Sequence, residues 1–83
     1  MIYYYVYILL DRKKNIYIGY TENLDRRFNE HLSKKVYYTI RLDNPILYYF
    51  EAYSNEDQAK NRERMLKKYG SAYVGLLKRI GLK

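Results

Sequence analysis

Four side chains within the first 31 residues have types and spacings that suit proton transfer and anion binding. Tyr7 and Tyr17 lie ten residues apart, and Arg27 and His31 lie four residues apart. A tyrosine takes up a proton only as a phenolate, and because its ordinary pKa is near 10, that role requires a cation or a metal ion nearby. An arginine offers a planar fork of donors to phosphate oxygens, and a histidine relays protons near neutral pH. This chemistry depends on elements that bring the four side chains together.

The two tyrosines fall on two predicted strands that form a hairpin. Residues Tyr3–Leu10 are all apolar or aromatic, of types that favour strands, and Ile16–Tyr20 is similar. The polar run Asp11–Asn15 (DRKKN) predicts the turn that joins them. Because the first strand is apolar on both faces, we expect it to be covered on both sides and central in its sheet.

The length of the turn decides whether the tyrosines meet. With a turn over residues 11–15, Tyr7 faces Gly19 and Leu9 faces Tyr17, which places all four residues on one face of the sheet. Tyr7 and Tyr17 are then diagonal neighbours, roughly 5.5–8 Å apart. A shift of one residue in register would send the two tyrosines to opposite faces. Gly19 has no side chain, so we expect open space above Tyr7.

Arg27 and His31 fall on a predicted helix that follows the hairpin. This helix covers residues 24 to about 32, and Thr21 or Asn23 is able to cap its start. Arg27 lies three residues and His31 seven residues after the first apolar position, so both fall on or beside the inward face. The apolar positions that define this face are Leu24, Phe28 and Leu32.

The second half of the chain adds one strand and two helices. Residues 33–44 (SKKVYYTIRLDN) show no clear periodicity, and a third strand is expected over Ile46–Tyr53. The resulting order is ββαβαα, so the expected fold class is α+β: a small three-stranded antiparallel sheet flanked by helices. With 83 residues and neither a linker nor a repeat, the chain is expected to form a single domain over residues 1–83.

The two C-terminal helices have their own boundary signals. Ser54 and Asp57 are typical of a capping box at the start of the first helix, and Gly70 is placed to end it after about Tyr69. The second helix is expected from Ser71 to about residue 80. Its inward side chains are expected to be Leu76, Leu77 and Ile80.

Composition and charge exclude several kinds of site and favour one class of partner. The chain has no cysteine and one histidine, which excludes disulfides, thiolate catalysis and metal sites built on cysteine or on several histidines. Sixteen Lys and Arg against nine Asp and Glu give a net charge of +7, which favours a polyanionic partner such as nucleic acid. The sequence shows no run of about 20 apolar residues and no signal peptide, so we expect a cytoplasmic protein that does not bind membranes.

The strand motifs and the helix start together resemble a known family. Residues 5–7 (YVY) stand where that family has its first motif, GIY, and residues 17–19 (YIG) match the second motif letter for letter. The spacing between the motifs and the following Asn-Leu-x-x-Arg segment also fit. Over nearly its whole length the chain is similar to the GIY-YIG nuclease superfamily, in the small single-domain form related to the catalytic domain of the bacterial excision-repair nuclease subunit.

The resemblance implies catalytic roles for five residues. Tyr17 would be the general base that takes a proton from water, and Tyr7 would position the water or assist. Arg27 would bind phosphate oxygens, and His31 would orient a group or relay a proton. Glu63 stands at the family's metal-binding glutamate, and one carboxylate is enough for Mg²⁺ or Mn²⁺, since such ions keep several waters. On the residues alone, a buried structural role for His31 and a salt bridge from Glu63 to a neighbouring lysine stay open.

The function that the resemblance implies is a metal-dependent endonuclease that hydrolyses phosphodiester bonds in DNA. Its substrates would include damaged, branched or flapped DNA, and its sequence preference alone would be small. Lys34, Lys35 and Arg41 lie near aromatic residues, a combination that suits a nucleic-acid surface. A homodimer or a larger protein complex would supply the target choice that attached domains supply elsewhere in the family.

Two departures from the family pattern keep alternatives open. Tyr5 replaces the glycine of the first motif, and the family's late asparagine has no clear counterpart after Glu63. One alternative is therefore a nucleic-acid-binding module of the same fold without efficient catalysis. A third interpretation is a partner-binding domain that uses exposed tyrosines as anchors.

Overall fold

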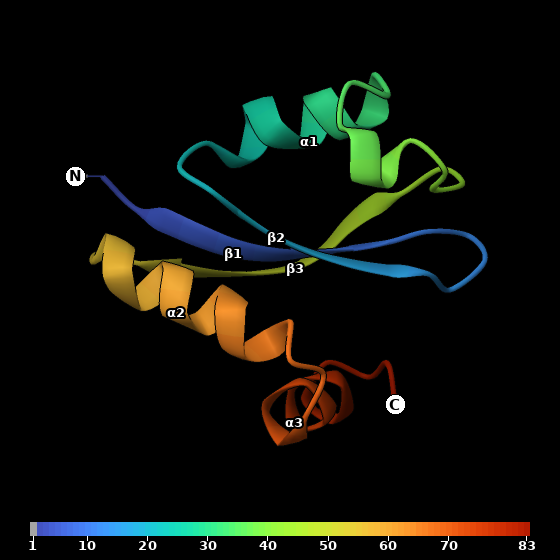
Figure 1. Cartoon of the computed structure of the whole chain (residues 1–83). Helices are drawn as coiled ribbons and strands as arrows, with labels where there is room; N and C mark the ends of the chain where they lie inside the picture. Colours follow the sequence, from blue (N-terminus) through green and yellow to red (C-terminus); the bar gives the residue numbers. More distant parts are fainter. Residues whose placement is uncertain (1) are drawn as a thin grey trace.

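A three-stranded antiparallel sheet with helices on both sides makes up the fold (Figure 1). The computed structural model describes residues 2–83, and residue 1 of the expected domain lies outside the described residues. The strands are β1 (Tyr4–Leu10), β2 (Ile16–Thr21) and β3 (Ile46–Tyr53), in the spatial order β2-β1-β3. The helices are α1 (Leu24–Leu32), the short 3₁₀ helix η1 (Tyr37–Thr39), α2 (Glu56–Leu66) and α3 (Ser71–Arg79). The predicted α+β class and the order ββαβαα are confirmed.

The predicted hairpin register is confirmed. Tyr7 pairs with Gly19 and Leu9 pairs with Tyr17 across β1 and β2. β1 is the central strand, as its apolar residues on both faces predicted, and four of its seven residues are buried. The tyrosines at positions 7 and 17 therefore share one face of the sheet.

The hairpin turn is held by the buried carboxylate of Asp11. It accepts hydrogen bonds from the backbone N–H groups of Lys13 at 2.9 Å and Asn15 at 2.8 Å. It also accepts a bond from the backbone N–H of Asp43 at 3.0 Å, which attaches the turn to the segment before β3. These bonds fix the length of the turn, and that length sets the register on which the tyrosine pair depends.

The hydrophobic core lies on the sheet face covered by α2 and α3 (Figure 1). Burying each of its large aliphatic side chains stabilises the fold by about 1.5–3 kcal/mol. Glu51 of β3 and Arg62 of α2 form two hydrogen bonds of 2.9 Å each, which join the sheet to the helix. Within residues 2–83, no helix is long and apolar enough to cross a membrane. The buried core cluster consists of Val6, Ile8, Ile18, Ala59, Leu66 and Leu76.

α1 lies over the opposite face of the sheet (Figure 1), and its inward side differs from the prediction at one position. Asn23 caps the helix by accepting a bond from the backbone N–H of Arg26 at 3.0 Å. Leu32, predicted to face inward, is 48% exposed, whereas His31 is 1% exposed. At about 100° per residue, a position seven residues after Leu24 returns to nearly the same direction, but the eighth is turned away by about 80°.

α2 begins one residue later than the predicted capping box implied. Asn55, rather than Ser54, is the N-cap, and its side chain accepts a bond from the backbone N–H of Gln58 at 3.1 Å. Asparagine caps as well as serine does, so the sequence alone did not separate the two adjacent positions.

The predicted end of this helix is wrong as well. α2 ends at Leu66, Tyr69 takes the left-handed φ of +56°, and Gly70 has a φ of −96° and precedes α3 as its N-cap. α3 ends one residue earlier than predicted, and its expected inward residues Leu76 and Leu77 are buried.

Candidate active site

Three rings from three different elements meet on the α1 face of the sheet. The ring centroids of Tyr7 and Tyr17 lie 6.3 Å apart. The centroid of the His31 ring lies 5.7 Å from that of Tyr7 and 5.2 Å from that of Tyr17. Gly19 makes this possible in a way that differs from the expectation. The space above it is filled by the ring of Tyr7 itself, and a Cβ at Gly19 would overlap the Tyr7 hydroxyl end. The glycine is therefore needed for the close approach of the ring.

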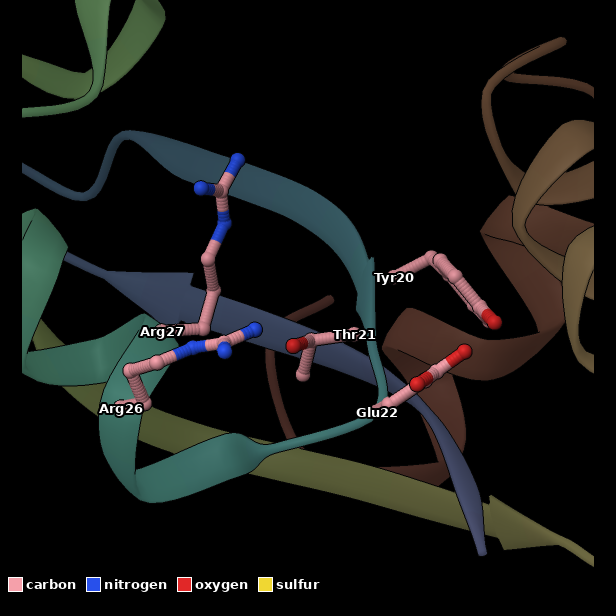
Figure 2. A pocket seen from close by; sticks show the side chains of 5 residues that line it. All are labelled: Tyr20, Thr21, Glu22, Arg26 and Arg27. Carbon is pink, nitrogen blue, oxygen red and sulfur yellow. The ribbon is translucent and has the colours of Figure 1, made fainter.

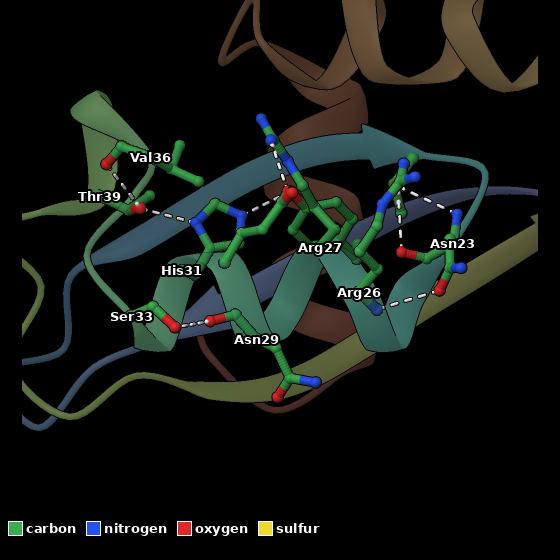
Figure 3. Close-up of polar contacts among 11 residues, drawn as sticks. Asn23, Arg26, Arg27, Asn29, His31, Ser33, Val36 and Thr39 are labelled. Carbon is green, nitrogen blue, oxygen red and sulfur yellow. Dashed lines mark hydrogen bonds and ion pairs between the residues drawn. The ribbon is translucent and has the colours of Figure 1, made fainter.

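A chain of hydrogen bonds runs inward from Tyr7. The Tyr7 hydroxyl lies 2.7 Å from His31 Nε2, and His31 Nδ1 lies 2.6 Å from Thr39 Oγ1. The Thr39 hydroxyl in turn donates to the backbone carbonyl of Val36 at 3.3 Å (Figure 3). All of the buried side-chain nitrogen and oxygen atoms in the described residues have hydrogen-bond partners.

The order of donors in this chain assigns the protons. Because the Thr39 hydroxyl donates to a carbonyl, its oxygen accepts from His31 Nδ1–H. His31 Nε2 is then unprotonated and accepts the hydroxyl proton of Tyr7. Burial lowers the pKa of His31, and the charge of Arg27 lowers it further, which favours this neutral ring. Thr39 thus fixes which nitrogen of the imidazole faces the site.

Tyr7 is held as a hydroxyl rather than a phenolate. Burial raises the pKa of Tyr7 well above its ordinary value, and the neighbouring Tyr17 raises it further. Arg27 acts in the opposite direction, and the negative charge of Glu63 again raises the pKa. The arrangement therefore suits Tyr7 to donate a hydrogen bond and Tyr17, which is half-buried, to face solvent.

The rings of Tyr7, Tyr17 and His31 form a group called the ring cluster below. Arg27 lies between this ring cluster and an adjacent surface pocket. Its guanidinium donates to Glu30 at 3.1 Å, and about a third of each side chain is exposed, so this partner is exchangeable. The pocket has a volume of about 270 Å³, and the Arg26 side chain extends towards Thr21 within it (Figure 2). Arg26 and Arg27 bring positive charge to this pocket, and Glu22 brings one carboxylate. The lining residues are Tyr20, Thr21, Glu22, Arg26 and Arg27.

Glu63 approaches the ring cluster from α2. Its carboxylate is half-buried and lies close enough to Tyr7 to act on its pKa. Lys67, one helical turn later, forms a salt bridge with Glu63 at 3.0 Å, and its ammonium lies 5.9 Å from the centre of the Tyr17 ring. The salt bridge that the sequence left open is therefore present, at the edge of the ring cluster.

The three residues predicted to bind nucleic acid lie beyond the end of α1 and are exposed. Lys34 donates through its ammonium to the backbone carbonyl of Leu42 at 2.9 Å, which gives it a structural contact. Arg41 lines a hollow together with Tyr37, Tyr38 and Ile40. Within the described residues, the side chain of Lys35 takes part in no hydrogen bond and no ion pair.

Sequence reasoning missed two residues of this region, Thr39 and Arg26, and it anticipated a lysine beside Glu63 without naming Lys67. Thr39 lies in an aperiodic segment, so nothing in the sequence indicated its contact with His31. Arg26 was not among the predicted site residues, although it lines the pocket beside Arg27. Lys67 had a usable signal, because a lysine four residues after a glutamate on a helix forms a pair with it.

The chain is similar to UPF0213 proteins from three organisms. A UPF0213 protein of Clostridium perfringens is 37% identical over 65 residues, which cover 77% of this chain and 70% of that protein. A UPF0213 protein of Haloquadratum walsbyi is 34% identical over 68 residues, which cover 81% of this chain and 76% of that protein. The solution NMR structure of a UPF0213 protein from Bacillus halodurans superposes with a TM-score of 0.59 at 29% identity, and covers 94% of this chain and 84% of the other.

A family model covers the whole of the site described above. Residues 3–76 match the GIY-YIG catalytic domain, a range that includes the ring cluster, Arg27 and Glu63. The two motif tyrosines stand on the paired strands at the expected register. The chain therefore belongs to the GIY-YIG family, a family of nuclease type.

Proposed function

We propose that this chain is a divalent-metal-dependent endonuclease that hydrolyses phosphodiester bonds in DNA. The observation that carries the proposal is the meeting of Tyr7, Tyr17 and His31 in one cluster beside Arg27 (Figure 3). Glu63 is joined to this cluster by Lys67, whose ammonium lies 3.0 Å from the Glu63 carboxylate and 5.9 Å from the centre of the Tyr17 ring. These groups supply a base, a proton relay, a phosphate clamp and a metal ligand within one site. These residues come from elements spread along the chain, from β1 to α2, so a chance grouping explains their meeting poorly.

Glu63 is the residue proposed to hold Mg²⁺ or Mn²⁺. Within the described part of the chain, no group of three or more His, Cys, Asp or Glu residues gathers in a way that would hold a metal ion. A hard cation that keeps several waters needs only one or two carboxylates, so a single half-buried glutamate fits as its donor. When bound, the cation would lower the charge on the phosphate and help the leaving oxygen.

The side chains of the cluster divide the remaining work. Tyr17 is half-buried, and the Lys67 ammonium lies 5.9 Å from the centre of its ring. Its oxygen takes the proton of a water molecule, the water oxygen bonds to phosphorus, and the bond to the leaving sugar oxygen breaks. Tyr7 remains a hydroxyl held by His31 and positions the water. Arg27 exchanges Glu30 for the phosphate oxygens.

The net charge of +7 favours a polyanionic substrate, and the resemblance to nucleases of the excision-repair type makes DNA the proposed one. Damaged, branched or flapped DNA is the proposed form of the substrate. Lys34, Lys35 and Arg41 are proposed to contact the phosphate backbone next to the site. A homodimer or a larger complex is proposed to supply target choice.

The proposal is tested by cleavage of duplex, flapped and single-stranded DNA in Mg²⁺, in Mn²⁺ and in chelator. Glu63→Gln has a matched control in Glu56→Gln, because each glutamate of α2 pairs with a lysine four residues later. We expect Glu63→Gln to lower the cleavage rate by more than about 100-fold, beyond the roughly 10–100-fold cost of losing a partner of a metal ligand. We expect Glu56→Gln to cleave at nearly the wild-type rate. Equal rates for the two variants, or undiminished cleavage in chelator, would refute the proposal.

A nucleic-acid-binding module without efficient catalysis is the second candidate. The observation that favours it is the 3.0 Å salt bridge of Lys67 to Glu63, which occupies the proposed metal ligand. The absence of a counterpart to the family's late asparagine favours it as well. This candidate predicts DNA binding that weakens with added salt and no cleavage in either metal.

A further inference from the structure

A second pocket opens beside Tyr17, outside the ring cluster and away from the pocket at Arg27. Its volume is about 420 Å³, within the roughly 300–1,000 Å³ typical of small-ligand sites. Tyr17 belongs both to this pocket and to the ring cluster, so a ligand held here would reach the Tyr17 side chain. The pocket lies between the edge strand β2 and the turn that joins α2 to α3. The lining residues are Ile16, Tyr17, Ile18, Tyr38, Lys67 and Tyr69.

Two tyrosines form exposed walls of this pocket. Tyr38 is 82% exposed and Tyr69 is 63% exposed, so the burial of apolar surface on folding does not explain either ring. Each ring is oriented by a second tyrosine in an edge-to-face contact. The centroids of Tyr37 and Tyr38 lie 5.4 Å apart at 88°, and those of Tyr69 and Tyr73 lie 5.0 Å apart at 84°. Most of the surface of both walls is therefore free, and the Tyr69 wall rests against the half-buried ring of Tyr73.

The backbone of Tyr69 is also unusual. Its φ of +56° lies in the left-handed region, which a bulky side chain rarely adopts, while the next residue, Gly70, has an ordinary φ of −96°. A glycine at position 69 would end α2 without strain. Strained residues of this kind are retained mainly at functional sites. The conformation therefore favours a role for the Tyr69 ring other than folding.

The charges around the pocket indicate the class of ligand. Lys67 lines the pocket, and Arg41 lines the neighbouring hollow that shares Tyr38. Among the lining residues of this pocket there is no carboxylate and no side-chain amide, the groups that would bind the hydroxyls of a sugar. Aromatic rings interleaved with cations are typical of surfaces that stack the bases of single strands and attract their phosphates.

We propose that the pocket between Tyr38 and Tyr69 holds an unpaired nucleobase of single-stranded DNA, next to the phosphate at Tyr17. The inference rests on the proposed function for the position of that phosphate, and it specifies the substrate as DNA with an unpaired nucleotide at the cleavage point. A paired base in a duplex has its faces covered by its neighbours and does not enter the pocket. Single-stranded segments, such as a flap, present such a base directly.

Binding in chelator tests the pocket independently of cleavage. Labelled single-stranded DNA and a blunt duplex of the same sequence are titrated with the full chain at one salt concentration, and fluorescence anisotropy gives each Kd. We expect tighter binding of the single strand, and a loss of about tenfold for Tyr38→Leu and for Tyr69→Leu with unchanged duplex affinity. Tyr38→Phe and Tyr69→Phe keep a ring and should bind as the wild type does. Tyr3→Leu is the control, since Tyr3 is exposed and lies outside the pocket.

Tyr69→Gly separates ligand binding from folding. Glycine accepts the left-handed φ without strain, so the variant should melt at no lower a temperature than the wild type while it loses affinity for the single strand. The inference is overturned if the leucine variants bind the single strand as the wild type does, or weaken the duplex equally. If the wild type cuts DNA but the Tyr38 and Tyr69 variants bind it with unchanged affinity, the proposed pocket is refuted and the proposed nuclease activity stands. If binding depends on the Tyr38 and Tyr69 rings but the wild type does not cut DNA, the proposed pocket stands and the proposed nuclease activity is refuted.

Discussion

At the scale of single residues, the site depends on a hydrogen-bond chain whose inner end lies away from the strands. A hydrogen bond to His31 orients the Tyr7 hydroxyl, and a hydrogen bond to Thr39 orients the His31 ring. Thr39 contacts neither substrate nor metal in the proposed reaction. Since the Thr39 hydroxyl donates to a backbone carbonyl, it leaves the imidazole one arrangement of its proton. Thr39 is therefore a positioning residue.

Thr39→Val tests this chain, because valine keeps the shape and removes the acceptor of His31 Nδ1–H. We expect the free energy of unfolding to fall by about 1–3 kcal/mol, the cost of a buried donor without a partner. We also expect the proton of the neutral ring to move to Nε2, which ¹⁵N NMR of the imidazole detects. Thr39→Ser should restore both properties. An unchanged tautomer in Thr39→Val would contradict the assignment.

At the scale of elements, the hairpin sets the geometry of the site through its turn and through Gly19. The turn bonds of Asp11 fix the register, and the register places Tyr7 over the one residue on β2 that has no side chain. The two features are coupled, because a shifted register would place the Tyr7 ring opposite a side chain.

Gly19→Ala is expected to lower the free energy of unfolding by about 1–3 kcal/mol, the usual cost of forcing an extra methyl group into a packed position. Gly75→Ala is the control, because a Cβ there meets nothing within 4 Å. Since Gly75 lies within α3, its replacement should stabilise the protein by about 0.5–1 kcal/mol. Urea unfolding measures both. Changes of the same sign would show that the contact with Tyr7 is unimportant.

The turn also predicts a dependence on pH. Burial alone would raise the pKa of Asp11, but the N–H donors of Asp43, Asn15 and Lys13 lower it to about 2. A folded-state pKa below the ordinary 3.8 contributes stability above that value, and the contribution is lost as the pH falls from about 4 to about 2. Asp11→Asn should therefore be less stable than the wild type at neutral pH. Urea titrations should show the difference shrinking over that window, and a difference independent of pH would contradict the account.

At the scale of the whole molecule, the charge of +7 predicts binding governed by counterion release. A plot of log Kd against log salt concentration should lose about one unit of slope for each phosphate contact removed. We expect this for Lys35→Gln and for Arg41→Gln. Replacement of Lys13 in the hairpin turn should leave the slope unchanged, and an equal effect there would show that the charge acts without a defined surface.

The fold was largely predictable from the sequence because its signals are local. Uninterrupted apolar residues marked β1 as central, and the length of one turn gave the register of the hairpin. Boundaries failed where two residues competed for one role. Asn55 took the cap expected of Ser54, and Tyr69 took the left-handed position expected of Gly70.

The site was predictable only in part, because some of its members meet through tertiary packing. Tyr7, Tyr17 and His31 were identified together, and the structure brings them within contact. Thr39 was missed since its segment has no periodicity, and only the path of the chain around η1 places it against His31. The second pocket was missed for the same reason, because Tyr38 and Tyr69 come from distant parts of the chain and line it together only in the folded protein.

The central claim is that Tyr17 takes the proton of the attacking water, and Tyr17→Phe tests it by removing a single oxygen atom. We predict that the single-turnover cleavage rate in Mg²⁺ falls by about 10²–10⁴-fold, the usual contribution of a general base. The melting temperature and the DNA affinity should stay at their wild-type values, and Tyr3→Phe should cleave normally. A Tyr17→Phe protein that cleaves as fast as the wild type would contradict the claim.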